Sequence, residues 1–264
     1  MIENGGSIQS WGPPVNRCLR ACLVSAAVVL ASSASALDLG GLLKGGEGAL
    51  KAATLSDSDI KELTDRACVE MDAKSKVAAP GDKYATRLAT VMRDMPAAIK
   101  DQPVNSKVYL TSSVNAWAMA NGCVRVYSGL MDMMNDDELR GVIGHEEGHV
   151  ALGHTRKAMQ TAYATSAARD LASSAGGTAA TLSQSQMGEL AEKFVNAQFS
   201  QTQESEADNY SFDLLTEKKL PREGLVTAFQ KLAKLDGGKS SMLSSHPSSA
   251  NRAENMQKRI DKKP

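Results

Sequence analysis

His145, Glu146 and His149 form the pattern H-E-x-x-H, which constrains this chain more than any other feature of its sequence. On an α-helix, two histidines four residues apart lie on one face, a turn apart, where both imidazoles can bind one metal ion. Glu146 is then placed to accept a proton from a metal-bound water. The alternative is a helix with two buried core histidines and surface glutamates. The pattern therefore indicates a catalytic metal site on a helix.

The helix that carries this pattern has its own start signals. Asn135 is a candidate N-cap, and Glu138 three residues later completes a capping-box pattern. Asp136 and Asp137 add negative charge near the positive end of the helix dipole. Apolar residues for burial follow at Leu139, Val142, Ile143, Val150 and Leu152. We therefore predict one partly buried helix in the stretch 135–160.

A catalytic zinc ion takes three protein ligands and keeps a fourth position for water, so a third ligand is needed. Outside the pattern, the only histidines are His154 and His246. His154 follows His149 by five residues, about 140° round a continuous helix, so we expect it to point away from the metal. A carboxylate on another helix is the natural alternative, and Glu204 is our candidate.

Glu204 belongs to the acidic run E-S-E-A-D. Asp208, four residues later, shares its helix face and could accept a hydrogen bond from the ring N–H of a ligating histidine. Glu206 is rotated about 200° from Glu204, so both cannot face the metal. The alternative for this cluster is a solvated helix face.

The overall composition narrows the class of protein. The 30 basic and 30 acidic side chains cancel, and aromatic residues make up only 4% of the chain. This balance gives no support to a nucleic-acid partner. With 264 residues and 42% hydrophobic content, the chain is long enough for one well-packed domain.

The N-terminal stretch has the features of an export signal. Arg17 and Arg20 precede an apolar core at 21–31, and residues 34–36 form an A-x-A cleavage site. An uncleaved membrane anchor is the alternative. Cys22 lies at the start of the apolar core, whereas a lipid-attachment cysteine should follow the core, so we expect no lipid anchor there. The predicted parts are a signal peptide at 1–36, a flexible linker at 37–54 and a folded domain at 55–264.

Two cysteines, Cys68 and Cys123, remain after removal of the signal. A single pair in an exported chain suggests a disulfide, worth roughly 2 to 4 kcal/mol. Two buried thiols are the alternative.

A small sheet is expected directly before the metal-site helix. In residues 107–128 the apolar residues change from helical spacing to the alternation typical of β-strands. Asn121 and Gly122 within this stretch are a strong signal for a two-residue hairpin turn. The edge of this sheet could bind an extended peptide as an added strand. The candidate substrate-binding residues at this edge are Asn115, Ala116 and Trp117.

Four stretches of this chain together resemble one family: NAWAMANGCVRVYSGLMDMM, HEEGHVALGH, QESEADNYSFDLL and SSHPSSANRAENM. They are similar to the HtpX-like zinc metallopeptidases, which are gluzincins, and within that family to the LoiP-type bacterial envelope proteases. The resemblance covers residues 56–260. It implies an α+β, mainly helical, zincin-like metallopeptidase domain with a small antiparallel sheet beside the H-E-x-x-H helix.

The resemblance also implies roles for individual residues. His145, His149 and Glu204 would bind one Zn²⁺ per chain, and Glu146 would be the general base. The substrates would be proteins or peptides, specifically misfolded or unassembled proteins of the bacterial envelope. The expected location is the periplasm, with peripheral association with the outer membrane left open. LoiP-like proteins are lipoproteins, but the position of Cys22 does not predict lipid attachment in this chain.

His246, in the sequence S-H-P, has three alternative roles. It is the best candidate for a catalytic donor of a hydrogen bond to the developing oxyanion, because the following proline restricts the backbone. It could instead occupy the open position of the zinc ion and switch the enzyme off. The third alternative is a surface histidine at a helix entrance.

Two rival functions use the same residues. A non-proteolytic, chaperone-like protein would keep a structural zinc and bind clients at the hairpin edge. An amidase or esterase would act on small molecules at the same site. A structural zinc site has no need for Glu146, so the sequence favours the peptidase.

Overall fold

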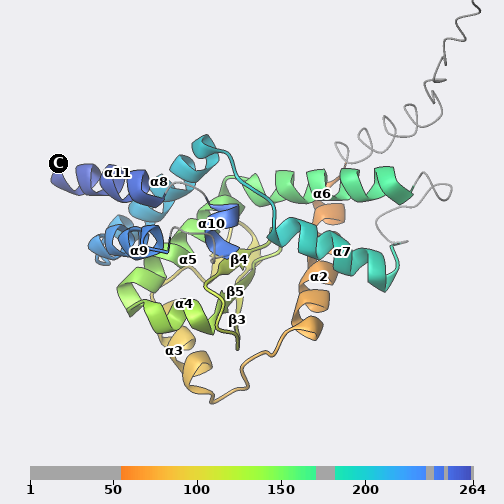
Figure 1. Ribbon diagram of the computed structural model, residues 1–264, viewed down its shortest axis with the longest axis horizontal. Coiled ribbons are helices and arrows are strands. Elements are labelled where there is room, and N and C mark those ends of the chain that lie inside the picture. Colours follow the sequence, from red (N-terminus) through yellow and green to blue (C-terminus); the bar gives the residue numbers. More distant parts are fainter. Residues whose placement is uncertain (1–54, 171–181, 236–240, 247–248, 263–264) are drawn as a thin grey trace, which may run out of the picture. The chain divides into compact units, whose positions relative to one another are not determined.

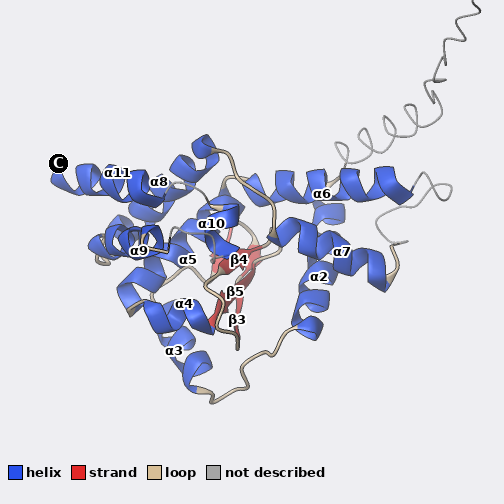
Figure 2. Cartoon of the chain, in the orientation of Figure 1, coloured by secondary structure: helices blue, strands red, loops and turns tan. Residues whose placement is uncertain are grey.

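The computed structural model describes residues 55–170, 182–235, 241–246 and 249–262 (Figure 1). The predicted signal peptide at 1–36 and linker at 37–54 lie outside the described residues. Within the described ranges, no helix is both long enough and apolar enough to cross a membrane. Helices and a small sheet together give the predicted α+β class (Figure 2).

The helices pack on both faces of a central sheet (Figure 1). Three helices cover one face: α2 (Asp57–Lys74), α6 (His154–Asp170) and α7 (Gln184–Val195). The helices on the other side are α3 (Lys83–Met92), α4 (Ser128–Met133), α5 (Asp136–Ala151), α8 (Gln201–Glu217), α9 (Glu223–Ala233) and α11 (Ser249–Asp261). The short helix α10 (Ser241–Ser245) precedes His246.

The central sheet is mixed, whereas the sequence predicts an antiparallel one. Its strands are β3 (Asn105–Tyr109), β4 (Ala116–Ala118) and β5 (Cys123–Tyr127), in the order β3-β5-β4. β4 and β5 are antiparallel, as predicted, but β3 is parallel to β5. The reason is that β4 runs opposite to β3, and the hairpin then turns β5 back between them, so that β5 runs in the same direction as β3. A separate two-stranded pair joins β1 (Ala98–Ile99) and β2 (Gln102–Pro103).

Side chains alternate across the sheet as strand geometry requires. Val124 and Val126 pack into the core shared with α5, while Trp117 and Tyr109 pack into the core shared with α2, α6 and α7. Both faces of the sheet are therefore buried.

The hairpin between β4 and β5 has a different turn from the predicted one. Met119 N–H donates to Cys123 O, so the connection contains three residues, 120–122, instead of two. Gly122 has a φ of 82°, and a Cβ there would lie 2.3 Å from Pro103 O. A left-handed glycine at the end of a three-residue loop is a common hairpin geometry. Gly122 is thus required both by its conformation and by the neighbouring backbone.

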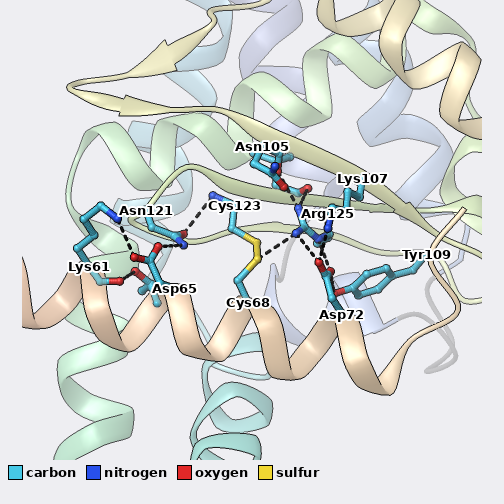
Figure 3. Close-up of a disulfide and its surroundings, with 12 residues drawn as sticks. Lys61, Asp65, Cys68, Asp72, Asn105, Lys107, Tyr109, Asn121, Cys123 and Arg125 are labelled. Atoms are coloured by element: carbon cyan, nitrogen blue, oxygen red, sulfur yellow. Dashed lines mark hydrogen bonds and ion pairs between the residues drawn. A yellow bond between two sulfur atoms is a disulfide. The ribbon is translucent and has the colours of Figure 1, made fainter. Parts of the chain in front are cut away.

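The predicted disulfide joins Cys68 of α2 to Cys123 of β5 (Figure 3). Beside it, the buried guanidinium of Arg125 donates to both carboxylate oxygens of Asp72, at 2.7 and 2.9 Å (Figure 3). Asp72 also accepts hydrogen bonds from Lys107 and from the hydroxyl of Tyr109. A covalent bond and a buried ion pair therefore hold α2 to the sheet.

The predicted single helix at 135–160 is in fact two helices. α5 begins with the predicted capping box, in which Asn135 and Glu138 bond reciprocally. It ends at Ala151, because Gly153 takes a φ of 79° and terminates it. The chain then turns, and α6 starts at His154. The prediction that His154 lies 140° round one continuous helix is therefore wrong.

Candidate metal centre and active site

Close packing of α5 against α8 brings the two halves of the site together. A Cβ at Gly144 would lie 2.8 Å from Ser211 Oγ, and one at Gly148 would lie 3.1 Å from Ala207 O. Ser211 also donates a hydrogen bond to the carbonyl of Gly141 on α5. The two backbones can approach this closely only because α5 has no side chains at these positions. The side chain of Glu204 on α8 therefore reaches the histidines of α5.

Four buried side chains bring their donor atoms to one point. Nε2 of His145 lies 3.0 Å from Nε2 of His149. Oε1 of Glu204 lies 3.4 Å from His149 Nε2, and Oε2 lies 3.6 Å from His145 Nε2. Nδ1 of His246 lies 2.8 Å from Glu204 Oε1 and 3.3 Å from His145 Nε2. The structure thus joins the three predicted ligands and adds His246 as a fourth donor.

The donor set fits a zinc ion. One donor atom from each of the four residues lies within 4.8 Å of the others. Tetrahedral zinc with Zn–N bonds of about 2.0–2.1 Å places its nitrogen ligands about 3.3 Å apart. The nitrogen separations of 3.0 and 3.3 Å match this spacing. Two histidines and a carboxylate are also a common ligand set of catalytic zinc.

The carboxylate of Glu146 lies beside this cluster, as predicted for the general base. Its side chain is buried, and Oε1 has no hydrogen-bond partner. The nearest ion-pair atom is His246 Nε2, at 3.5 Å. The unsatisfied oxygen lies close to the ligand atoms, where it could accept a proton from a metal-bound water.

The pKa values of the cluster follow from burial and mutual contact. Burial raises the pKa of Glu146 to about 7. Burial also raises the pKa of Glu204, but hydrogen bonds from His149 and His246 outweigh it and hold that pKa well below its usual range. Burial lowers the pKa of His149 to about 4 and moves that of His145 in the same direction. Both histidines of α5 are therefore neutral near pH 7, the form that binds metal.

Asp208 lies behind His145, as predicted. Its Oδ1 is 2.8 Å from His145 Nδ1, the ring nitrogen that does not face the cluster. The guanidinium of Arg252, on α11, donates to both oxygens of Asp208 at 2.6 and 2.9 Å. Arg252 Nη1 also lies 2.7 Å from Glu204 Oε2. Arg252 therefore binds both Asp208, which contacts His145, and Glu204 of the cluster.

The family follows from comparison of this sequence with known proteins. The model of peptidase family M48 matches residues 82–260. The chain belongs to peptidase family M48. It is 52% identical over 244 residues to the metalloprotease LoiP of Escherichia coli strain K12, across 92% of this chain and 97% of that protein. It is also 52% identical over 225 residues to the metalloprotease YcaL of the same organism, across 85% of this chain and 89% of that protein.

Membership of the M48 family makes this chain a metalloprotease and confirms the resemblance to the HtpX-like metallopeptidases. Its substrates are accordingly proteins or peptides. The three ligands predicted from the sequence meet in the buried cluster, and the predicted base, Glu146, lies beside it.

Three residues around the M48 site were not predicted. Phe199 stacks on the ring of His149, with 3.9 Å between centroids. Arg252 contacts Asp208 and Glu204, and His154 contacts His149. Arg252 lies within the stretch SSHPSSANRAENM, which was the available signal for it. For His154, the glycine at position 153 was the signal, because it marks a possible helix end.

The predicted substrate residues lie at the edge strand of the sheet. β4 pairs only with β5, so its other edge is free of strand partners among the described residues. Ala116 and Trp117 line a cavity of about 10 Å³ together with Glu146 and His246, whereas Asn115 does not line it. All three predicted substrate residues are buried. The structure thus brings two of them to the base, but beneath other side chains.

Proposed function

We propose that this M48 metalloprotease is a zinc-dependent endopeptidase of the bacterial cell envelope that hydrolyses misfolded or unassembled proteins. The observation that carries this proposal is the buried cluster of His145, His149 and Glu204 with the buried carboxylate of Glu146 beside it, one oxygen of which has no hydrogen bond. A structural zinc site would not need that carboxylate, so the arrangement favours hydrolysis over a chaperone-like role.

His145, His149 and Glu204 would hold the zinc ion, and Glu146 would move the proton. Bound zinc supplies Lewis acidity, which lowers the pKa of water and polarises a peptide carbonyl. Glu146 accepts a proton as the water oxygen bonds to the carbonyl carbon. It returns a proton to the leaving amine nitrogen as the C–N bond breaks. Its raised pKa of about 7 suits both transfers, and positive charge at the cluster would lower that value and favour the base form.

The position of His246 supports the second of its three alternative roles, in which it occupies the open position of the zinc ion. The prediction of a surface histidine is wrong, since His246 is 3% exposed. Its Nδ1 lies among the ligand atoms, so in this conformation the ring occupies the space that an oxyanion at the metal would need. We therefore infer that His246 acts as a fourth ligand, which fills the position that water needs and limits activity in this conformation.

The edge of β4 is the proposed binding site for an extended substrate. A peptide added there would run past Glu146, with main-chain hydrogen bonds that do not depend on sequence. Phe199 and Ser245 line the same cavity as β4, and Phe199 N–H donates to Ser245 O at 3.3 Å. Substrate entry therefore requires that the segments carrying Phe199 and Ser245 move away from β4.

The proposed envelope location rests on the predicted signal peptide and on the disulfide between Cys68 and Cys123. Disulfides persist in oxidising compartments such as the periplasm and are rare in the cytosol. Peripheral association with the outer membrane belongs to the same proposal.

Hydrolysis of casein, an unfolded protein, tests the proposed function. We expect activity in the zinc-loaded wild type, loss of activity with a chelator, and recovery on addition of zinc. Glu146→Gln should bind zinc without turnover. Glu147→Gln is the matched control, because Glu147 is buried on the same helix and burial raises its pKa to about 8, so it is mostly neutral near pH 7.

Two results of the casein assay would contradict the proposal. Activity that persists in the chelator, or equal activity in Glu146→Gln and the wild type, would each exclude the proposed mechanism. Hydrolysis of a short ester without hydrolysis of casein would favour the small-molecule alternative.

A further inference from the structure

The two histidines of the H-E-x-x-H pattern have different partners on their outer nitrogens. His145 contacts the carboxylate of Asp208 directly. For His149, Nδ1 lies 3.0 Å from Nδ1 of His154, whose Nε2 lies 3.0 Å from Oε2 of Glu206. We propose that His154, oriented by Glu206, is a positioning residue that fixes the tautomer and the ring orientation of His149 for metal binding. This inference rests on the proposed zinc site.

When Nε2 of His149 binds the metal and the ring of His154 is neutral, the three groups have one consistent order of protons. An ionised carboxylate can only accept, so Glu206 favours a proton on Nε2 of His154. The neutral ring of His154 then has a lone pair on Nδ1, which accepts from the Nδ1–H of His149. Nε2 of His149 is left without a proton and faces the cluster, 3.4 Å from Glu204 Oε1. The opposite tautomer of His154 would set two N–H groups against each other.

The ring of His149 is held in two independent ways. Phe199 stacks on its face at an interplanar angle of 26°, which fixes the plane of the ring. The contact with His154 fixes the rotation of the ring within that plane. The side chain of His154 is buried, whereas that of Glu206 is 52% exposed. Water can therefore replace Glu206 in part, but it has little access to the contact between the two histidines.

The backbone explains why His154 reaches this position. Gly153, with its φ of 79°, ends α5 and lets α6 begin at His154. The change of direction brings the ring of His154 to 5.1 Å from that of His149, measured between centroids. With His154 in this position, each acidic residue of the run on α8 has its own partner. Glu204 faces the cluster, Asp208 faces His145 and Glu206 faces His154.

The rate of zinc release from the zinc-loaded protein into an excess of a chromogenic chelator tests this positioning role. His154→Phe keeps a ring but removes both nitrogens, and we expect zinc release to become roughly 10- to 100-fold faster. His154→Asn should recover most of this loss, because its amide oxygen can accept from His149. Glu206→Ala should accelerate release by only about two- to fivefold, since water replaces an exposed acceptor.

A double variant separates a relay from a general loss of structure. If Glu206 acts through His154, adding Glu206→Ala to His154→Phe should cause no further acceleration. Full additivity of the two effects would contradict the relay. Urea unfolding of each variant identifies any that is merely unfolded, and the exposed Glu206→Ala variant and His154→Asn keep the test valid if His154→Phe does not fold.

Nitrogen-15 chemical shifts of the zinc-loaded wild type give a direct spectroscopic readout. We expect the proton of His154 on Nε2 and an unprotonated Nδ1. A proton on Nδ1 of His154, or folded His154→Phe that releases zinc at the wild-type rate, would overturn this inference alone. A wild-type protein that neither binds zinc nor cleaves casein would overturn the proposed function as well.

Discussion

Oδ1 of Asp208 lies 2.8 Å from Nδ1 of His145, at the end of the ring that faces away from the ligand cluster. The guanidinium of Arg252 holds this carboxylate and also lies 3.0 Å from the same ring nitrogen. Asp208 can only accept and Arg252 can only donate, and the shorter contact favours a proton on Nδ1. Nε2 of His145 is then free to bind metal, so Asp208 links the tautomer of His145 to zinc affinity.

Asp208→Asn should lower the affinity for zinc by roughly 10- to 100-fold, the range found for partners of metal-binding histidines. The variant keeps the shape of the side chain but removes the charge that pairs with Arg252. Competition with a chelator of known affinity provides the measurement. Asp213→Asn on the same helix is the control, because Asp213 is exposed and pairs only with Arg259 among the described residues. Wild-type affinity in Asp208→Asn would contradict this role.

His246→Ala should increase casein hydrolysis by up to roughly tenfold, the gain expected when a blocking contact of about 1.4 kcal/mol is removed. The reason is that the Nδ1 atom of His246 lies among the ligand atoms in this conformation. Zinc should also leave the variant faster, because a fourth donor is lost. If hydrolysis instead falls while zinc stays bound, His246 is an oxyanion donor and the fourth-ligand role is wrong.

Asp72→Asn should destabilise the protein by about 3–5 kcal/mol, because the buried guanidinium of Arg125 loses its charged partner (Figure 3). Urea unfolding at pH 7 measures this loss. Asp65→Asn, on the same helix, removes a half-exposed ion pair with Lys61 but keeps a side-chain oxygen that can accept from Asn121, so it should cost less than about 1 kcal/mol. Equal stability of Asp72→Asn and Asp65→Asn would contradict the importance of the buried pair.

The stability difference between wild type and Asp72→Asn should depend on pH. Burial raises the pKa of Asp72, but hydrogen bonds from Arg125, Lys107 and Tyr109 outweigh it and lower the pKa from 3.8 to about 2. Because the folded-state pKa is the lower one, the stabilisation is fully present above the unfolded-state value near 4. It is lost as the pH falls from about 4 to about 2. The stability difference between the two proteins should shrink by about 1–2 kcal/mol over this range.

Replacement of both Cys68 and Cys123 by serine should lower the free energy of unfolding by about 2–4 kcal/mol. The disulfide spans a sequence separation of 55 residues and joins α2 to β5, so its loss frees a long loop in the unfolded chain. Urea unfolding with and without a reductant provides the measurement. The folded variant should still bind zinc, since neither cysteine contacts the cluster. Unchanged stability would contradict the contribution of the disulfide.

Local sequence patterns predicted the centre of the site well. The capping box of Asn135 and Glu138 and the spacing of His145 and His149 depend only on helix geometry, which the structure reproduces. Glu204 was predictable because a catalytic zinc needs a third ligand, a carboxylate suits that position, and the resemblance to the HtpX-like family implies this one. The sequence therefore predicted His145, His149 and Glu204 of the cluster, whereas a ligand role for His246 was only one of three alternatives.

Residues that depend on a change of chain direction were not predictable in this way. His154 was expected to point away because the helix was extended through Gly153, whose positive φ ends α5. The parallel pairing of β3 with β5 arises from the path of residues 110–115, which carry no periodic signal. Arg252 reaches the site only through the packing of α11 on α9 and α8, a contact between distant segments. Such contacts are decided by tertiary packing and not by local propensity.

The zinc content of Glu204→Gln, measured together with casein hydrolysis, tests the central claim most directly, since Glu204 is the one proposed carboxylate ligand and comes from a helix outside the H-E-x-x-H pattern. We predict about one zinc per chain in the wild type and in the exposed control Glu217→Gln, both of them active. Glu204→Gln should retain little zinc after dialysis and lose hydrolysis by at least about 100-fold. A folded Glu204→Gln variant with full zinc content and wild-type hydrolysis would contradict the account.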